Sequence, residues 1–241
     1  MNTALILSGG IGGRMGIEIP KQYIEVQNRL VISYSIEVLS RHAGIDAIQI
    51  VAAPQWHEKI VESLTMYDKD KKFRGFSAPG ENRQLSIYHG LTDIRSFAKD
   101  SDIVLIHDAA RPLLSEQIIT DSLSAVEGHD GVLPILPMKD TIYKSEDGRR
   151  IDALLDRDKL FAGQAPETFR IGAYYQANRR LRFEQMLSIN GAAEPAFMAG
   201  LDIVMIAGDE DNFKITTKKD LERFELKKER QIFQNPSHSV S

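Results

Sequence analysis

The chain has 241 residues, 42% of them hydrophobic, and a formal net charge of -4. This length and apolar content suit one large α/β domain, and the mixed charges leave no basic stripe for nucleic acid and no basic amphipathic face for a membrane. Cysteine is absent, which excludes a disulfide framework and a cysteine metal site. Because no apolar run approaches the ~20 residues of a membrane span and no signal-like segment follows Met1, we expect a cytoplasmic protein.

Strand-like and helix-like segments alternate along the first 136 residues. Short apolar runs predict strands, apolar residues at helical spacing predict helices, and Ser115 and the pair Thr217 and Asp220 supply helix caps. The alternation predicts a Rossmann-like, mostly parallel sheet flanked by helices. The expected strands are 3–7, 47–52, 73–78, 103–106, 132–136 and 202–206, and the expected helices are 31–42, 57–66, 82–94, 115–126, 168–181 and 218–230.

The pattern changes at Pro137. Residues 138–162 are polar, and Asp147-Gly148 is typical of a hairpin turn between strands at 141–144 and 150–154. We expect a β-arm that projects from the sheet, and a homodimer formed through it, since an isolated hairpin must bury its apolar face elsewhere. The arm belongs to a single domain over 1–232, and the apolar-poor tail 233–241 is expected to be disordered.

A glycine-rich segment with two flanking cations follows the first expected strand. Without a Cβ, glycine lets backbone amides approach a ligand and point in one direction. Amides combined with arginine and lysine suit a polyphosphate, although an ordinary turn between a strand and a helix is the alternative. The residues concerned are Gly9, Gly10, Gly12, Gly13, Arg14 and Lys21.

Two common nucleotide-binding loops do not match this segment. A Walker loop requires a Gly-Lys pair, which the chain lacks. A dinucleotide fingerprint requires a third glycine where Met15 stands, and an acidic residue after the second strand, where the chain has Ala53-Pro54. An NAD-type site is therefore not expected.

Asp108 and Arg111 follow the apolar strand at 103–106. In an open parallel sheet, ligands collect at the carboxyl ends of the strands, where an aspartate can hold a ribose hydroxyl or a divalent ion and an arginine a phosphate. A buried Asp–Arg pair that ends the strand is the alternative, and His107 is expected to be a packed strand-end histidine.

Two further clusters flank expected strands. Residues 80–86 offer a glycine with amide and hydroxyl groups suited to a base edge, or else form a charged helix start. Lys214 follows the last strand and could reach an α-phosphate, or else is an ordinary solvated lysine. Because no Ser–His–Asp, Cys–His or clustered metal-ligand pattern appears, the expected chemistry is charge neutralisation, as in phosphoryl and nucleotidyl transfer.

Taken in order from Ala4 to about Glu225, these motifs resemble the cytidylyltransferases that make CDP-activated polyols, the family of 2-C-methyl-D-erythritol 4-phosphate cytidylyltransferase and ribitol-5-phosphate cytidylyltransferase. The matching segments are residues 8–15, Pro20-Lys21-Gln22-Tyr23, Gly80-Glu81-Asn82-Arg83 with Ser86, His107-Asp108-Ala109-Ala110-Arg111-Pro112, Lys139-Asp140-Thr141, Asp156-Arg157, Gln164-Ala165-Pro166 and residues 212–217.

The resemblance implies a role for each position, in a CTP-dependent nucleotidyltransferase that uses Mg²⁺ and a small polyol phosphate. Arg14 and Lys21 with the glycine loop, including Gly9 and Gly12, would hold the triphosphate, and Lys214 would serve the α-phosphate. The cytosine base would be bound by Ser8, Gly80, Glu81 and Ser86. The ribose would be contacted by Gly10, Asp108 and Ala109. Arg111, Thr141 and Arg157 would bind the acceptor, the last two at a neighbouring subunit's site, and Asp108 is also the candidate metal ligand.

Departures from the family pattern fall on the acceptor side. The family usually shows Gln-Thr-Pro-Gln where this chain has Gln164-Ala165-Pro166-Glu167, and Thr-Asp-Glu-Ala where it has Ala193-Glu194-Pro195-Ala196. The acceptor is therefore left open between 2-C-methyl-D-erythritol 4-phosphate and ribitol 5-phosphate. Rival hypotheses are a sugar-phosphate nucleotidyltransferase that uses another nucleoside triphosphate, and a catalytically silent nucleotide-binding protein.

Overall fold

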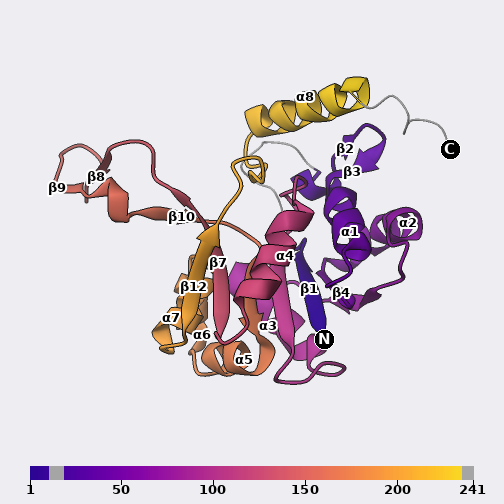
Figure 1. Cartoon of the computed structure of the whole chain (residues 1–241), viewed down its shortest axis with the longest axis horizontal. Helices are drawn as coiled ribbons and strands as arrows, with labels where there is room; N and C mark the ends of the chain where they lie inside the picture. The colour runs from indigo at the N-terminus through magenta and orange to yellow at the C-terminus, as the bar shows by residue number, and fades with distance from the viewer. Residues whose placement is uncertain (11–18, 235–241) are drawn as a thin grey trace.

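The computed structural model describes residues 1–10 and 19–234, which are built around a central sheet (Figure 1). Within these residues the sheet has eight strands in the order β10-β7-β11-β6-β1-β4-β5, with β12 also paired to β7. The strands are β1 (Asn2–Leu7), β4 (Ala47–Val51), β5 (Phe73–Ser77), β6 (Ile103–Asp108), β7 (Gly131–Pro137), β10 (Phe161–Gly163), β11 (Glu167–Arg170) and β12 (Ile203–Ala207).

Helices cover both faces of the sheet because its central strands are apolar on both sides. Along β1, Ala4 and Ile6 pack with α1, α2 and α4, whereas Leu5 packs with α3, α5 and residues of α7. Helix α8 crosses the molecule beyond the carboxyl ends of the parallel strands (Figure 1). The helices are α1 (Val31–Arg41), α2 (His57–Tyr67), α3 (Arg83–Ile94), α4 (Glu116–Ala125), α5 (Ile171–Arg179), α6 (Phe183–Ser188), α7 (Ala193–Met198) and α8 (Lys218–Gln234).

The strand order reverses between β1 and β6. From β1 the chain adds β4 and β5 on one side, all parallel, and then returns to place β6 on the other side of β1. In open α/β sheets such a reversal leaves a crevice beyond the carboxyl ends of the two strands, and ligands bind there. Leu7 and Asp108 are register partners at this point.

The predicted mostly parallel α/β sheet is confirmed, but the helix expected over 168–181 is wrong in its first turn. Glu167–Arg170 form β11, antiparallel to both β6 and β7, and helix α5 begins at Ile171. Thr168 and Phe169 are fully buried between the neighbouring strands. Sheet pairing of a β-branched and an aromatic residue therefore overrides the helical pattern that continues from α5.

Several short elements escape the sequence pattern. Strand β10, helices α6 and α7, and the small hairpin β2 (Glu25–Val26) with β3 (Arg29–Leu30) were not expected. The described residues also form the 3₁₀ turns η2 (Lys21–Tyr23), η3 (Pro54–Trp56) and η4 (Arg157–Lys159). Helix α8 extends to Gln234, and the rest of the predicted tail lies outside the described residues.

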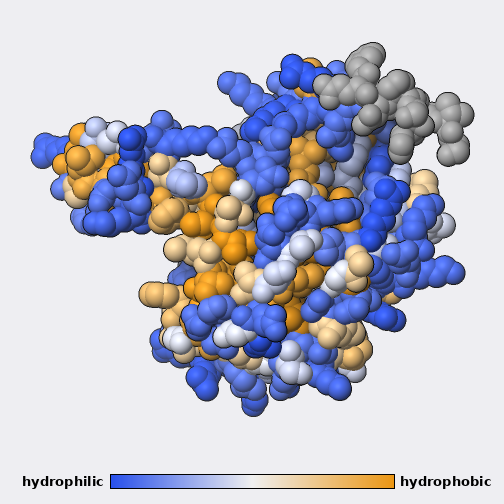
Figure 2. All heavy atoms as spheres, viewed as in Figure 1, coloured by the Kyte–Doolittle hydropathy of each residue, from blue (hydrophilic) through white to orange (hydrophobic). Residues whose placement is uncertain are grey.

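The arm leaves the sheet after β7 and returns through β10 (Figure 1). Its hairpin pairs β8 (Ile142–Lys144) with β9 (Ala153–Leu155), so Asp147-Gly148 lies within a longer loop and not in a two-residue turn. Gly148 still provides the positive φ of 69° that the loop needs. Ile151 and Leu154 are each 67% exposed, and Figure 2 shows apolar side chains on the arm's surface.

Among the described residues, the longest helices fall short of the length and hydropathy needed to cross a bilayer.

The contact between α3 and β1 gives a test of the packing. A Cβ at Gly90 would lie 2.6 Å from Leu5 Cδ1, in a fully buried environment. We expect Gly90→Val to lower the free energy of unfolding by about 2 kcal/mol, since overpacking a filled core costs ~1–3 kcal/mol. Thr92→Val, an isosteric change on the exposed side of the same helix, is the control and should change it by less than about 0.5 kcal/mol. Equal denaturant midpoints for both variants would contradict the packing described.

Candidate active site at the carboxyl ends of β1 and β6

The start of the glycine loop is fixed by two side chains of η2. Gln22 Nε2 donates to the carbonyl oxygens of Ser8 and Gly10, each at 2.8 Å. Tyr23 Oη donates to Ser8 O at 2.9 Å and accepts from Ser8 Oγ at 2.8 Å. Gln22 and Tyr23 are almost fully buried, so η2, which Lys21 opens, is anchored directly beneath the loop. Gly12 and Arg14 lie outside the described residues.

Most of the residues predicted to bind the cytosine base lie beside the start of this loop. A Cβ at Gly9 would lie 2.7 Å from Pro79 Cβ, so the two backbones approach closely at a point where glycine is needed. Gly80 N donates to Ser86 Oγ at 3.0 Å, and Ser86 lies in the first turn of α3. Glu81 is exposed. Ser8, Gly80 and Ser86 therefore lie near the start of the glycine loop.

Asp108 is the centre of a cluster of charged side chains at the carboxyl end of β6. It ends β6, and Ala109 N donates to Leu7 O at 3.0 Å, which ties the turn to β1. Lys214 Nζ donates to Asp108 Oδ2 at 2.9 Å, and Arg83 Nε donates to Oδ1 at 3.1 Å. Arg111 Nε lies 3.6 Å from Oδ2.

These three cations decide the charge of Asp108. Burial alone raises the pKa of this carboxyl, but Arg83, Lys214 and Arg111 outweigh burial and hold its pKa well below the usual range. Asp108 is therefore ionised at neutral pH. The sequence allowed two interpretations of Asp108 and Arg111, a ligand-binding pair and a buried ion pair that ends the strand. The two are compatible, because the ion pair lies at the edge of the sheet where a ligand would bind.

Lys214 reaches Asp108 because the loop after β12 is attached to the end of β6. Ile215 N donates to Ala110 O at 2.8 Å, and Ile215 is fully buried. Asn212 is also fully buried; its Nδ2 donates to Ala165 O at 2.7 Å, and its carbonyl accepts from Arg111 Nη1 at 2.6 Å. The loop therefore presents Lys214 from a fixed backbone.

His107 is a structural residue, as expected. It is fully buried, and its Nε2 lies 3.0 Å from Arg111 O and 3.2 Å from Ser35 Oγ. Burial lowers its pKa to about 4, so the imidazole is neutral at physiological pH. Its contact with the Arg111 carbonyl helps to hold the turn between Asp108 and Arg111.

The sequence interpretation gave no role to several residues that build this site. Arg83, which lay within a quoted motif, bridges Asp108 and Glu167; its Nη2 donates to Glu167 Oε2 at 2.7 Å. Gln22, Tyr23 and Asn212 hold the two loops. The available signal was Glu167, an acidic residue where the family usually shows Gln. The sequence interpretation placed this departure on the acceptor side, but Glu167 begins the buried strand β11 and contacts Arg83.

A metal ion of the size of Mg²⁺ fits this site only together with a phosphorylated ligand. No group of three or more histidine or acidic side chains suited to a cation occurs in residues 1–10 and 19–234. Both oxygens of Asp108 already accept hydrogen bonds from cations. Such a donor set suits an ion that takes most of its ligands from phosphate and water, which is a common mode for Mg²⁺.

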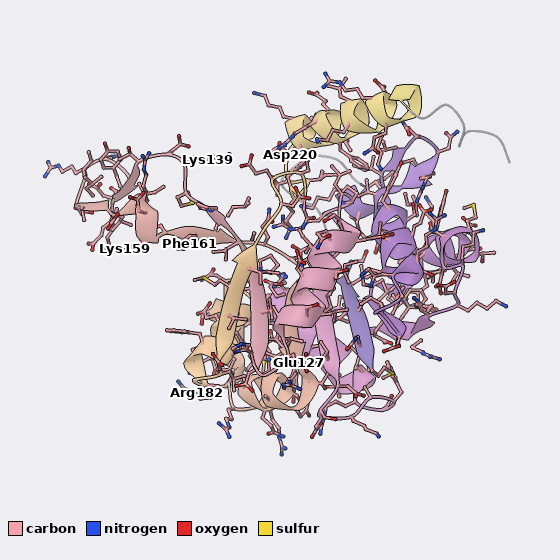
Figure 3. All side chains as sticks on the ribbon, in the orientation of Figure 1. Glu127, Lys139, Lys159, Phe161, Arg182 and Asp220 are labelled. Carbon is pink, nitrogen blue, oxygen red and sulfur yellow. The ribbon has the colours of Figure 1, made fainter. Side chains whose placement is uncertain are left out.

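Thr141 and Arg157 lie apart from the other predicted site residues. Both are exposed on the arm, and Arg157 Nη1 donates to Lys139 O at 2.9 Å. Figure 3 shows Lys159 on the arm, to the side of the sheet. The contacts of Arg157 are to Lys139 and Asp158, and it forms no hydrogen bond or ion pair with Asp108 or its three cations.

The chain is similar to known cytidylyltransferases. The family model of 2-C-methyl-D-erythritol 4-phosphate cytidylyltransferase matches residues 3–228. The chain is 35% identical to the protein of that name from Syntrophotalea carbinolica, over 90% of this chain and 91% of the relative. It is 31% identical to a ribitol-5-phosphate cytidylyltransferase from Vibrio parahaemolyticus, over 91% of this chain and 92% of the relative.

A solved structure supports the fold. The crystal structure of 4-diphosphocytidyl-2C-methyl-D-erythritol synthase from Anaerococcus prevotii superimposes with a TM-score of 0.80 at 24% identity, covering 95% of this chain and 96% of that one. The family match spans the crevice and the arm alike. The chain therefore belongs to the 2-C-methyl-D-erythritol 4-phosphate cytidylyltransferase family and is a CTP-dependent nucleotidyltransferase.

Proposed function

We propose that this protein transfers CMP from CTP to a small polyol phosphate and releases pyrophosphate. The observation that carries the proposal is the cluster of Arg83, Arg111 and Lys214 around Asp108, at the point where the strand order reverses. A cluster of partly exposed cations next to a glycine loop suits a polyphosphate, and nucleotidyl transfer requires charge stabilisation above all.

In the proposed reaction an oxygen of the acceptor phosphate attacks the α-phosphorus of CTP. The new P–O bond forms as the bond between the α-phosphorus and the bridging oxygen breaks, and pyrophosphate leaves with the electron pair. A phosphate dianion is already a competent nucleophile, so no protein base is needed. This agrees with His107, whose buried ring is neutral and bonded to backbone.

Lys214 is the residue that we assign to the α-phosphate. An ammonium group has three donors, and one of them is directed to Asp108. The carboxylate thereby fixes the group without neutralising the positive charge of the whole cluster. As negative charge builds on the phosphoryl oxygens, a preoriented ammonium stabilises it without reorganisation.

The remaining nucleotide contacts follow from the same placement. Lys21 and Arg14 are assigned to the triphosphate with the loop of Gly9, Gly10 and Gly12. Ser8, Gly80, Glu81 and Ser86 are assigned to cytosine, and Gly10, Asp108 and Ala109 to the ribose; Ser8, Gly80 and Ser86 lie together beside the loop. When bound with CTP, Mg²⁺ would offset phosphate charge, with Asp108 as its candidate protein ligand.

The acceptor contacts are assigned to Arg111 and to the arm. Arg111 is assigned to the acceptor phosphate, with Thr141 and Arg157 supplied by the arm of a second copy in a homodimer. The exposed Ile151 and Leu154 support an arm that packs against another chain. Relatives named for 2-C-methyl-D-erythritol 4-phosphate and for ribitol 5-phosphate both match over nine-tenths of the chain, so both acceptors are proposed.

Lys21→Ala tests the triphosphate cradle. We expect a loss of about 2–4 kcal/mol of transition-state stabilisation, the usual effect of removing one preorganised charge contact. The measurement is kcat/KM for CTP by pyrophosphate release. Lys69→Ala, which removes an exposed cation beyond α2, is the control and should match the wild type. Unchanged turnover in Lys21→Ala would remove Lys21 from the mechanism.

A panel of acceptors separates the possible reactions. Pyrophosphate release from CTP and Mg²⁺ is measured with 2-C-methyl-D-erythritol 4-phosphate, ribitol 5-phosphate and glycerol 3-phosphate offered separately, with UTP in place of CTP as the nucleotide control. We expect one of the first two acceptors to exceed the others by at least about tenfold in kcat/KM, since a site that pairs a substrate hydroxyl rejects analogues lacking it. Turnover with UTP alone would contradict cytidylyl transfer.

Subunit mixing tests the role of the arm. Lys214→Gln and Arg157→Ala are each expected to be nearly inactive. In a mixed dimer, one site would combine an intact Lys214 with an intact Arg157 from the other chain, so a refolded equimolar mixture should regain about a quarter of wild-type activity. If Arg157 acts within its own chain, mixing restores nothing.

A further inference from the structure

We propose that Glu167 is a positioning residue: acting through Arg83 and Asp108, it fixes the ammonium group of Lys214. The inference deepens the proposed function, because it rests on the assignment of Lys214 to the α-phosphate. Glu167 forms no hydrogen bond or ion pair with Lys214, and it belongs to a different strand from Asp108. Its effect on Lys214 therefore passes through other side chains.

The connection is continuous. Glu167 Oε2 accepts from Arg83 Nη2 at 2.7 Å, Arg83 Nε donates to Asp108 Oδ1 at 3.1 Å, and Asp108 Oδ2 accepts from Lys214 Nζ at 2.9 Å. Each member comes from a different element: β11, α3, β6 and the loop after β12. The four side chains form one line of charge-assisted hydrogen bonds.

The orientation of the Arg83 guanidinium group decides which of its nitrogens bind Asp108. A guanidinium can bind one carboxylate with two parallel hydrogen bonds, which is its favoured geometry. Here Glu167 takes Nη2, and only Nε is directed at Asp108. Without the Glu167 charge, Arg83 is free to turn both nitrogens toward Asp108 and to compete with Lys214 for it. Glu167 thus keeps Oδ2 of Asp108 available to Lys214.

Glu167 is held rigidly enough for this task. It begins β11, where it pairs in register with Ile106 of β6, and it is 8% exposed. Burial raises the pKa of Glu167, while the ion pair with Arg83 opposes that effect. Three cations and two carboxylates share the cluster, so loss of Glu167 leaves Asp108 alone among Arg83, Arg111 and Lys214.

The first experiment measures kcat and KM for CTP in Glu167→Gln, which keeps the shape and a hydrogen-bond acceptor but removes the charge. We expect kcat to fall about tenfold, the lower end of the effect of residues that orient a reacting group, with KM changed by less than about threefold. Thr168→Val is the matched control on the same strand: Thr168 is fully buried, and its hydroxyl has no hydrogen-bond partner. It should retain the wild-type kcat.

The second experiment repeats Glu167→Gln in a Lys214→Gln background under single-turnover conditions. If Glu167 acts through Lys214, it now changes the rate by less than about twofold, because interacting residues are non-additive. A full tenfold loss in this background, or an effect on KM alone, would overturn the proposal. Absence of CTP turnover in the wild-type protein would count instead against the proposed function.

Glu167→Asp distinguishes an effect of the Glu167 charge from a loss of folding. It keeps the charge on a side chain one methylene shorter, and it is expected to recover at least part of the kcat lost in Glu167→Gln. All rates are taken below the onset of unfolding, which circular dichroism defines for each variant. Equal kcat values for folded Glu167→Asp and Glu167→Gln would show that the charge is irrelevant and would reject the inference.

Discussion

The ionised, buried carboxylate of Asp108 is the constraint on which the crevice depends. A carboxylate removed from water is costly unless cations compensate it, and breaking such an arrangement costs more than a surface pair contributes. The compensation comes from α3, from the turn after β6 and from the loop after β12. These segments are far apart in sequence, so the cluster forms only when the sheet is assembled, and the folded chain then holds its cations in fixed positions.

Topology explains how these segments meet. The strand order reverses between β1 and β6, and the antiparallel β11 lies between β6 and β7. Because β12 runs parallel to β7, its carboxyl end lies at the same edge as that of β6, and the following loop can cross to Asp108. A strand that ran the other way next to β7 would carry Lys214 to the opposite edge.

The sequence predicted those parts of the site that depend on local pattern. Asp108 follows an apolar run, Lys214 follows the last strand, and both positions mark strand ends without knowledge of the pairing. Glu167 and Arg83 could not be found in this way, since their contact requires β11 to be a strand. Residues 168–170 continue the pattern of α5, and only the neighbours of Thr168 and Phe169 in the sheet decide for a strand. Because residues 168–170 were interpreted as helical, the sequence did not indicate that Glu167 begins a strand and is buried.

The placement of the assigned residues separates the two substrates. The nucleotide-side residues that the structure describes come from one chain and rest on buried strands, η2 and α3. The acceptor-side residues Thr141 and Arg157 are exposed on an arm that leaves the sheet. On the proposed assignment, a change in the hairpin of the arm alters the acceptor without replacing Asp108 or its cations, whereas the segment at Ala165 is bonded to the Lys214 loop through Asn212. The relatives likewise share the word cytidylyltransferase in their names but differ in the polyol phosphate.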